Sequence, residues 1–144
     1  MKLILDTNAY VGFKLGSPQI VEYLTRADVL LISPIVLGEL MFGFRNGSRY
    51  GANMAELNQF LSHPAVEVPS LSEITADRYS RIAAQLKRQG TPIRSNDIWI
   101  AAQTMETGAE LVTMDKYFVE IGGLVYRLFK KNLVGRVSIP DNDQ

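Results

Sequence analysis

The chain has 144 residues, in which fifteen basic and fifteen acidic side chains cancel. This length fits one domain with a substantial core, and the balanced charge argues against a simple nucleic-acid-binding module. Because cysteine is absent, disulfides and thiolate metal sites are excluded, and a reducing cytoplasm is the expected location.

The apolar residues fall in short runs. None approaches the ~20 residues of a membrane span, and the run after Met1-Lys2 is too short for a signal-peptide core. Short runs rich in branched aliphatic residues predict strands that are buried on both faces of a sheet. In chain order these runs cover residues 3–5, 29–32, 66–68, 111–113 and, more weakly, 124–128.

Helical patterns lie between the predicted strands. Serine followed by proline, at residues 17–18 and again at 33–34, predicts two helix starts with proline at the first helical position. The helix after Ser33 has one apolar stripe with the spacing i, i+3, i+4, i+7. This stripe consists of Leu37, Leu40, Met41 and Phe44.

Three further helices follow. One covers the region of residues 57–61 and ends near His63-Pro64, and a longer one extends from a capping Ser72 to a terminal Gly90. The last begins at residues 95–96, where Ser95 or Asn96 can cap it, and ends at Gly108. Strands alternating with helices predict a mostly parallel sheet covered on both faces, with its working site beyond the carboxyl ends of the strands.

Four acidic residues occupy informative positions, and this fold would bring three of them, Asp6, Asp97 and Asp115, to one edge of the sheet. Asp6 directly follows the first strand, Asp115 follows the fourth, and Asp97 opens the helix before the fourth. Glu39 is the only charged residue in the interior of its apolar helix. Carboxylates held close together repel and raise one another's pKa, and a hard divalent cation with oxygen ligands relieves that repulsion.

Each of these acids also has an ordinary explanation. An aspartate after a strand often forms a turn or caps a helix, which applies to Asp6 and Asp115. Asp97 could stabilise a helix dipole, and Glu39 could be a partly solvated helix residue. Beside the acids, the polar groups of three residues could hydrogen-bond the carboxylates or a bound water, although the first two could equally form a turn. These residues are Thr7, Asn8 and Thr113.

Four stretches of the chain, taken in order, resemble the motifs of PIN-domain ribonucleases, and most closely the VapC-like toxins of bacterial toxin–antitoxin pairs. The most specific is NDIWIAA within IRSNDIWIAA, and the others are LILDTNAY, SPIVLGELMFG and LVTMDKYF. The resemblance covers about residues 1 to 125. It implies a PIN-like three-layer α/β/α fold with a central, mostly parallel sheet of about five strands.

The resemblance also implies cleavage of RNA phosphodiester bonds that depends on Mg²⁺ or Mn²⁺. The family's acidic set falls on Asp6, Glu39, Asp97 and Asp115, with Thr113, Thr7 or Asn8 in support. We expect Asp6 and Asp97 to be the main metal ligands. Asp115 would be a ligand or hold a bound water, and Glu39 would bind a second ion or orient the attacking water.

The chain departs from the family pattern in two places. Some relatives carry a further acid or polar group shortly after the last aspartate, where this chain has residues 116–118, KYF. The ligation of a second metal, and whether one or two ions bind, is therefore open. Residues 126–144 extend past the usual end of the family and have no family interpretation, although we expect residues 1–144 to form a single domain.

A homodimer and a small antitoxin that inserts a peptide near the acids are further implications of the resemblance. Without the four acids, fifteen basic residues face eleven acidic ones, so the surface presented to RNA would be positive. Candidates for phosphate contacts are Arg45, Arg49, Arg94 and Lys116, each of which could instead be a solvated surface charge. We expect Phe42 to pack in the core, with contact to a partner as the alternative.

Other functions fit the sequence less well. A receiver-like Mg²⁺-binding signalling domain needs paired acids after the first strand, and a haloacid-dehalogenase-type phosphatase needs aspartate where Asn8 stands. The only histidine, His63, lies outside every motif, which argues against a Ser/His/Asp hydrolase. A PIN-like domain that binds RNA without cleaving it remains the main alternative.

Overall fold

A computed structural model of the chain describes residues 1–131. Its centre is a five-stranded, entirely parallel sheet with the strand order β3-β2-β1-β4-β5. The strands are β1 (Lys2–Leu5), β2 (Val29–Ile32), β3 (Val66–Glu67), β4 (Glu110–Thr113) and β5 (Tyr126–Leu128). The predicted α/β fold with about five strands is confirmed.

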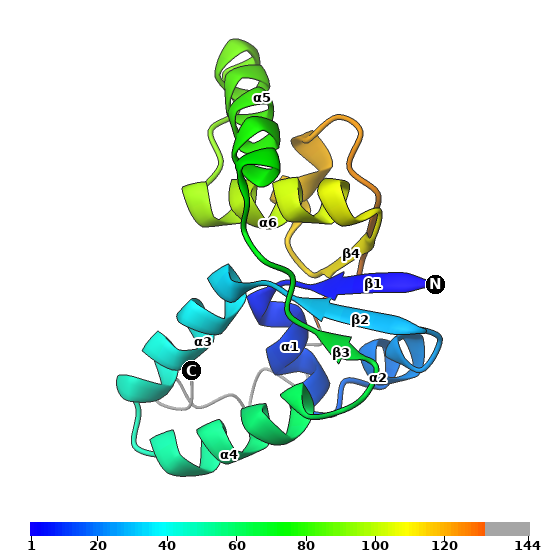
Figure 1. The fold of residues 1–144 in the computed structure, drawn as a ribbon, viewed down its shortest axis with the longest axis vertical. Helices are drawn as coiled ribbons and strands as arrows, with labels where there is room; N and C mark the ends of the chain where they lie inside the picture. The colour runs from blue at the N-terminus through cyan, green and yellow to red at the C-terminus, as the bar shows by residue number, and fades with distance from the viewer. Residues whose placement is uncertain (132–144) are drawn as a thin grey trace.

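The helices cover the sheet on both faces, which gives three layers (Figure 1). Strand order proceeds outward from β1 to β3 and then reverses to β4 and β5, so right-handed crossovers place the early and late helices on opposite faces. One face carries α1 (Thr7–Lys14), α2 (Pro18–Leu24), α3 (Pro34–Arg45) and α4 (Tyr50–Leu61). The other carries α5 (Glu73–Gln89), α6 (Ser95–Thr107) and the 3-10 helix η1 (Lys116–Glu120).

Burial of the central strand on both faces explains its unbroken apolar sequence. Leu3, Ile4 and Leu5 are all fully buried. Helix α6 is buried on more than one side, because it lies between the sheet and α5. Even its polar residue Gln103 is fully buried. Among residues 1–131, no helix combines the length and the hydropathy that crossing a bilayer requires.

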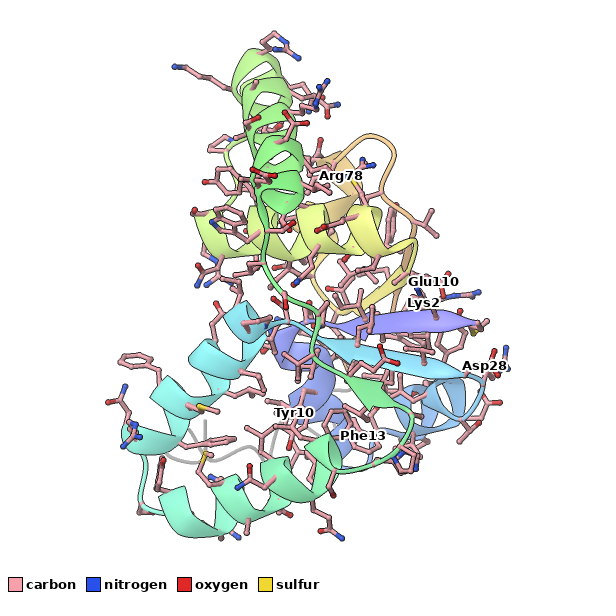
Figure 2. All side chains as sticks on the ribbon, in the orientation of Figure 1. Lys2, Tyr10, Phe13, Asp28, Arg78 and Glu110 are labelled. Carbon is pink, nitrogen blue, oxygen red and sulfur yellow. The ribbon has the colours of Figure 1, made fainter. Side chains whose placement is uncertain are left out.

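Aromatic side chains join α1 to α4. The rings of Tyr10 and Phe60 meet edge to face at 5.2 Å, and the Phe13 and Phe60 rings lie 5.7 Å apart. Figure 2 shows Tyr10 and Phe13 projecting from α1 toward α4. Helix α1 was not predicted from the sequence, in which Thr7 and Asn8 could either hydrogen-bond the acids or form a turn. This packing holds the helix start, and with it Asp6, at the end of β1.

Several predicted helix ends are confirmed. The Ser33 side chain accepts a hydrogen bond from the Ile35 N–H, and α5 and α6 both end at glycines in the left-handed region, Gly90 (φ 74°) and Gly108 (φ 71°). Ser17 precedes α2 as expected, but its side chain makes no capping bond.

The prediction that Ser95 or Asn96 caps α6 is wrong, since the N-cap residue is Arg94. Both side chains bond to other parts of the chain instead. The Ser95 hydroxyl pairs with the Tyr79 hydroxyl at 2.7 Å, and the Asn96 amide donates to Glu39. Tertiary partners have replaced the local cap.

The start of α5 offers a test of local stability. Ser72 and Thr75 form a reciprocal capping box, in which the Ser72 hydroxyl accepts from the N–H groups of Ile74 and Thr75. We expect Ser72→Ala to lower the free energy of unfolding in urea by about 1 kcal/mol. Ser80→Ala, an exposed change within the same helix, is the control and should stay within about 0.5 kcal/mol of the parent chain. Equal effects of the two changes would contradict the capping role.

The region that the sequence analysis assigned to a C-terminal extension begins inside the sheet. Residues 126–128 form the edge strand β5, and the Phe129 ring packs on Tyr23 of α2 with centroids 5.5 Å apart. The rest of that predicted extension, residues 132–144, lies outside the described residues.

Candidate active site

Asp6 stands where β1 ends and α1 begins, at the point in the sheet where strand order reverses. It is the N-cap of α1, and its Oδ1 accepts from the Ala9 N–H at 2.8 Å while Oδ2 accepts from the Thr113 hydroxyl. Only 5% of the residue is exposed. Burial raises the pKa of Asp6 to about 6, and the nearby charges of Asp97 and Asp115 act in the same direction, against the two hydrogen bonds.

Asp97 lies in the first turn of α6 and is equally buried. Burial is the main cause of its raised pKa, and Asp115 and Glu39 raise that pKa further, whereas Arg94 lowers it. The Arg94 guanidinium lies 3.3 Å and 3.4 Å from the two Asp97 oxygens. Since 74% of the Arg94 side chain is exposed, this ion pair is screened by water and compensates the buried charge only in part.

Glu39 joins three helices. Its side chain, on α3, accepts one hydrogen bond from the Thr7 hydroxyl of α1 and one of 3.1 Å from the Asn96 amide of α6. The residue is half-buried, which confirms that protein surrounds it in part. Thr7 and Asn96 therefore hold the carboxylate in one orientation.

Asp115 follows β4 and caps η1, where its Oδ1 accepts from the Tyr117 N–H at 2.9 Å. Its own N–H donates to the Thr113 hydroxyl, also at 2.9 Å. Thr113 is fully buried and donates in turn to Asp6. One hydroxyl thus connects the ends of β1 and β4 and positions both aspartates.

The four acids form one electrostatic cluster at the carboxyl edge of β1 and β4. Asp6 is influenced by the charges of Asp97 and Asp115, and Asp97 by those of Asp115 and Glu39. The only basic residue among these influences is Arg94, whose pKa is raised chiefly by Asp97, with smaller effects from Glu39 and Asp115. The strand pattern predicted that three of these acids, Asp6, Asp97 and Asp115, meet at one edge, and the family resemblance added Glu39.

The donor chemistry of the acidic cluster fits a hard divalent cation. Its groups are carboxylate oxygens, and two of them are buried with raised pKa values, as anions without full compensation would be. Within the described part of the chain, no three His, Asp or Glu side chains are close enough together to hold a metal ion. Mg²⁺ is usually bound through one or two carboxylates and retained waters, so a buried pair such as Asp6 and Asp97 is sufficient.

The other predicted site residues differ in whether they interact with the acidic cluster. Asn8 is exposed and makes no hydrogen bond to the four acids among residues 1–131. Arg45, at the end of α3, stacks over the Tyr50 ring at 4.6 Å, and Arg49 precedes α4. Of the four candidates for phosphate contacts, only Arg94 forms an ion pair with an acid of the cluster, and exposed Lys116 adjoins Asp115 in sequence.

Two features of this site were not found from the sequence. Asn96 was considered only as a cap and Arg94 only as a phosphate contact, yet both interact directly with acids of the cluster. Their positions within three residues of Asp97 were the available signal.

The expectation that Phe42 packs in the core is wrong, because α3 buries Val36, Leu40 and Phe44 and leaves Phe42 68% exposed.

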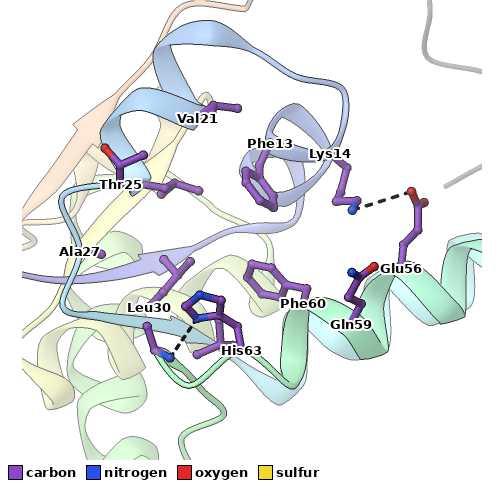
Figure 3. Close-up of a pocket in the computed structure, with 13 residues that line it drawn as sticks. Phe13, Lys14, Val21, Thr25, Ala27, Leu30, Glu56, Gln59, Phe60 and His63 are labelled. Atoms are coloured by element: carbon purple, nitrogen blue, oxygen red, sulfur yellow. Dashed lines mark hydrogen bonds and ion pairs between the residues drawn. The ribbon is translucent and has the colours of Figure 1, made fainter.

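A cavity of about 560 Å³ lies near the amino end of β2, between α1, α2 and α4 (Figure 3). His63 lines this cavity, and its Nδ1 accepts from the Ala65 N–H at 3.0 Å. Phe13 and Phe60 form apolar walls, and none of the four acids reaches it. The cavity is therefore separate from the acidic cluster.

Residues 3–124 match the PIN domain family. Over 136 residues the chain is 30% identical to ribonuclease VapC2 of Rickettsia felis, with 91% of this chain and 100% of that relative covered. It is 28% identical over 127 residues to the tRNA(fMet)-specific endonuclease VapC of Shigella flexneri, with 86% of this chain and 95% of that relative covered.

Solved structures show the same fold. The structure of VapBC-1 from nontypeable Haemophilus influenzae matches with a TM-score of 0.80 at 29% identity, over 89% of this chain and 98% of that one. The match over most of the chain assigns the fold to the PIN class of domain. The chain belongs to the PIN-domain family and, within it, to the VapC ribonuclease toxins of toxin–antitoxin systems.

Proposed function

We propose that the acidic cluster is the active site of an endoribonuclease that depends on Mg²⁺ or Mn²⁺. The observation that carries this proposal is the electrostatic coupling of Asp6, Glu39, Asp97 and Asp115 at one sheet edge. Buried carboxylates with raised pKa values cost stability unless a cation compensates them, so their retention together indicates a site.

Each residue has a distinct role in this proposal. Asp6 and Asp97, which are buried and poorly solvated, would hold the cation, and Asp115 would complete its surroundings. Glu39, fixed by Thr7 and Asn96, orients the water that attacks phosphorus. A divalent ion bound here supplies positive charge to the phosphate oxygens and a lower pKa for water.

Arg94 provides the second positive charge in the proposal. Its guanidinium is exposed and reaches Asp97 from the solvent side. With a cation at Asp97, Arg94 would be available to contact an RNA phosphate, to which its planar fork is well matched. Lys116, exposed next to Asp115, is a second candidate for such a contact.

The partners in this proposal follow from the relatives. Names of the relatives include a tRNA(fMet)-specific endonuclease, and the solved relatives are toxin–antitoxin complexes. We propose an RNA substrate, a small antitoxin that binds near the acids, a homodimer and a cytoplasmic location. Comparing bacterial growth during induction of the parent chain and of Asp6→Ala tests the toxic effect, and equal growth would contradict it.

Incubation of the protein with end-labelled RNA and Mn²⁺ tests the proposed reaction. We expect cleavage that stops in EDTA and falls at least a thousandfold in Asp97→Asn, since a lost metal ligand removes several kcal/mol of transition-state stabilisation. RNA that is bound but not cut would favour the non-cleaving alternative. Full activity of Asp97→Asn would overturn the role of that residue.

Thr113 tests whether positioning matters as well as charge. Thr113→Val keeps the shape of the side chain but removes the hydroxyl shared by Asp6 and Asp115. We expect the rate of RNA cleavage to fall about 10- to 100-fold, as for other groups that orient metal ligands. Thr113→Ser retains the hydroxyl and should restore most of the rate, whereas equal losses in both variants would indicate that packing alone is responsible.

A further inference from the structure

Helix α3 has a second face, which the core covers only in part: Ile35 packs against the core, whereas Phe42 is exposed. Residues 35, 38, 39 and 42 follow the spacing i, i+3, i+4, i+7 and therefore share one side of the helix. The buried side of α3 is a different set, formed by Val36, Leu40 and Phe44. Phe42, at 68% exposure, is the most exposed large apolar side chain among residues 1–131.

This second face opens into a cavity beside the acidic cluster. The cavity has a volume of about 320 Å³ and is lined by Pro34, Ile35, Gly38, Glu39, Phe42 and Asn96. It therefore combines an aromatic ring and an apolar floor with two polar side chains. One of these, Glu39, belongs to the acidic cluster, so whatever lies in the cavity lies next to the proposed site of cleavage.

Gly38 lines the floor of the cavity and has no side chain that would project into it. Glycine is one of the poorest helix formers, yet it stands in the interior of α3. A Cβ atom built on Gly38 would meet nothing within 4 Å, so the packing of the chain on itself does not require glycine there. A remaining reason for glycine at this position is that it lets a ligand approach the helix backbone closely.

We propose that this cavity is a nucleobase subsite, in which the Phe42 ring stacks on an unpaired base of the RNA next to the cleaved phosphodiester. The inference rests on the proposed function and deepens it. Single-stranded RNA is commonly recognised by stacking of bases on aromatic side chains and by hydrogen bonds to base edges. A flat apolar floor, one exposed ring and a polar edge match that chemistry.

The polar edge also limits which bases fit. Asn96 lines the cavity and its amide nitrogen donates to Glu39, so its carbonyl oxygen is an acceptor, and each carboxylate oxygen of Glu39 can accept a second hydrogen bond. Acceptors at the edge favour bases that present N–H donors. A peptide segment of a protein partner is the competing occupant, and the test below separates the two.

Binding of single-stranded RNA, measured by fluorescence anisotropy in an Asp97→Asn background that does not cut, provides the first test. We expect Phe42→Leu to weaken binding about 5- to 150-fold, the range for loss of one stacked base, and Phe42→Trp to retain it. Ile74→Ala removes an apolar group of α5 that is 59% exposed and should leave binding unchanged. That control is remote, because its neighbour Thr75 bonds to Glu106 near the far end of α6.

Gly38→Ala is the second variant. It should keep or raise the melting temperature, since alanine favours the helix and meets open space, while it weakens RNA binding several-fold by filling the floor. Because RNA binding is expected to weaken without a fall in the melting temperature, a folding defect cannot imitate the result.

Cleavage by the chain with its natural Asp97 completes the test. The substrates are RNAs that each lack one base, at successive positions. We expect loss of the base at one position next to the cut to raise KM for the parent chain. In Phe42→Leu this loss should no longer change KM. RNA that binds through Phe42 without being cut would overturn the proposed function and support the subsite. Equal RNA affinity of Phe42→Leu and its parent would overturn the subsite and leave this face to a protein partner.

Discussion

Asp6→Asn is expected to abolish RNA cleavage and, without metal, to make the protein more stable. The substitution removes a charge that is 5% exposed and repelled by Asp97 and Asp115. A pKa raised from 3.8 to about 6 corresponds to about 3 kcal/mol of destabilisation at neutral pH. Asparagine keeps the shape and can still accept from the Ala9 N–H, so the free energy of unfolding in EDTA should rise by up to that amount.

The same substitution removes a proposed metal ligand, so it should lower the rate of RNA cleavage. We expect the cleavage rate with Mn²⁺ to fall at least about a thousandfold. Asp77→Asn is the matched control, because Asp77 is exposed and its ion pair with Arg81 lies on the surface. For this variant the free energy of unfolding should change by less than about 1 kcal/mol, and cleavage should be unaffected. A destabilised Asp6→Asn with full activity would show that Asp6 is only the N-cap of α1.

Stability of the metal-free protein is expected to fall as pH rises from 4 to 7. Folding raises the pKa of Asp6 and of Asp97, so the folded state binds more protons than the unfolded state in this range. The free energy of unfolding therefore decreases with rising pH, by about 3 kcal/mol from Asp6 alone, with the loss complete once the pH exceeds the folded-state value of about 6. Urea denaturation in EDTA at several pH values measures this dependence.

Excess Mn²⁺ should weaken or reverse the pH dependence of stability. The ion binds deprotonated carboxylates of the folded state, so its stabilising effect grows as the acids ionise and amounts to about 2.7 kcal/mol at a hundred times the Kd. The pH dependence in EDTA should become much smaller in Asp6→Asn. A flat profile for the parent chain in EDTA would show that the buried acids are compensated within the protein.

Local features of the chain were predicted well because they depend on neighbours in sequence. Strands appear as short branched apolar runs, and the ends at Ser33, Ser72, Gly90 and Gly108 follow from hydrogen bonds and dihedral preferences within one helical turn. Helix α1 was missed because its apolar spacing is weak and its first two residues are polar. The Asp6 cap, recognised only as one possibility, was the signal for it.

The sequence by itself determined the fold class and the meeting of Asp6, Asp97 and Asp115, since parallel strands bring their carboxyl ends to one edge. The role of these acids in catalysis and the extent of the domain stay predictions. Only the tertiary structure decided that Asn96 and Thr7 hold Glu39 and that Phe42 faces solvent. Such contacts join residues 32 and 57 positions apart, and α3 carries apolar residues on several sides, so spacing alone could not choose which of them the core buries.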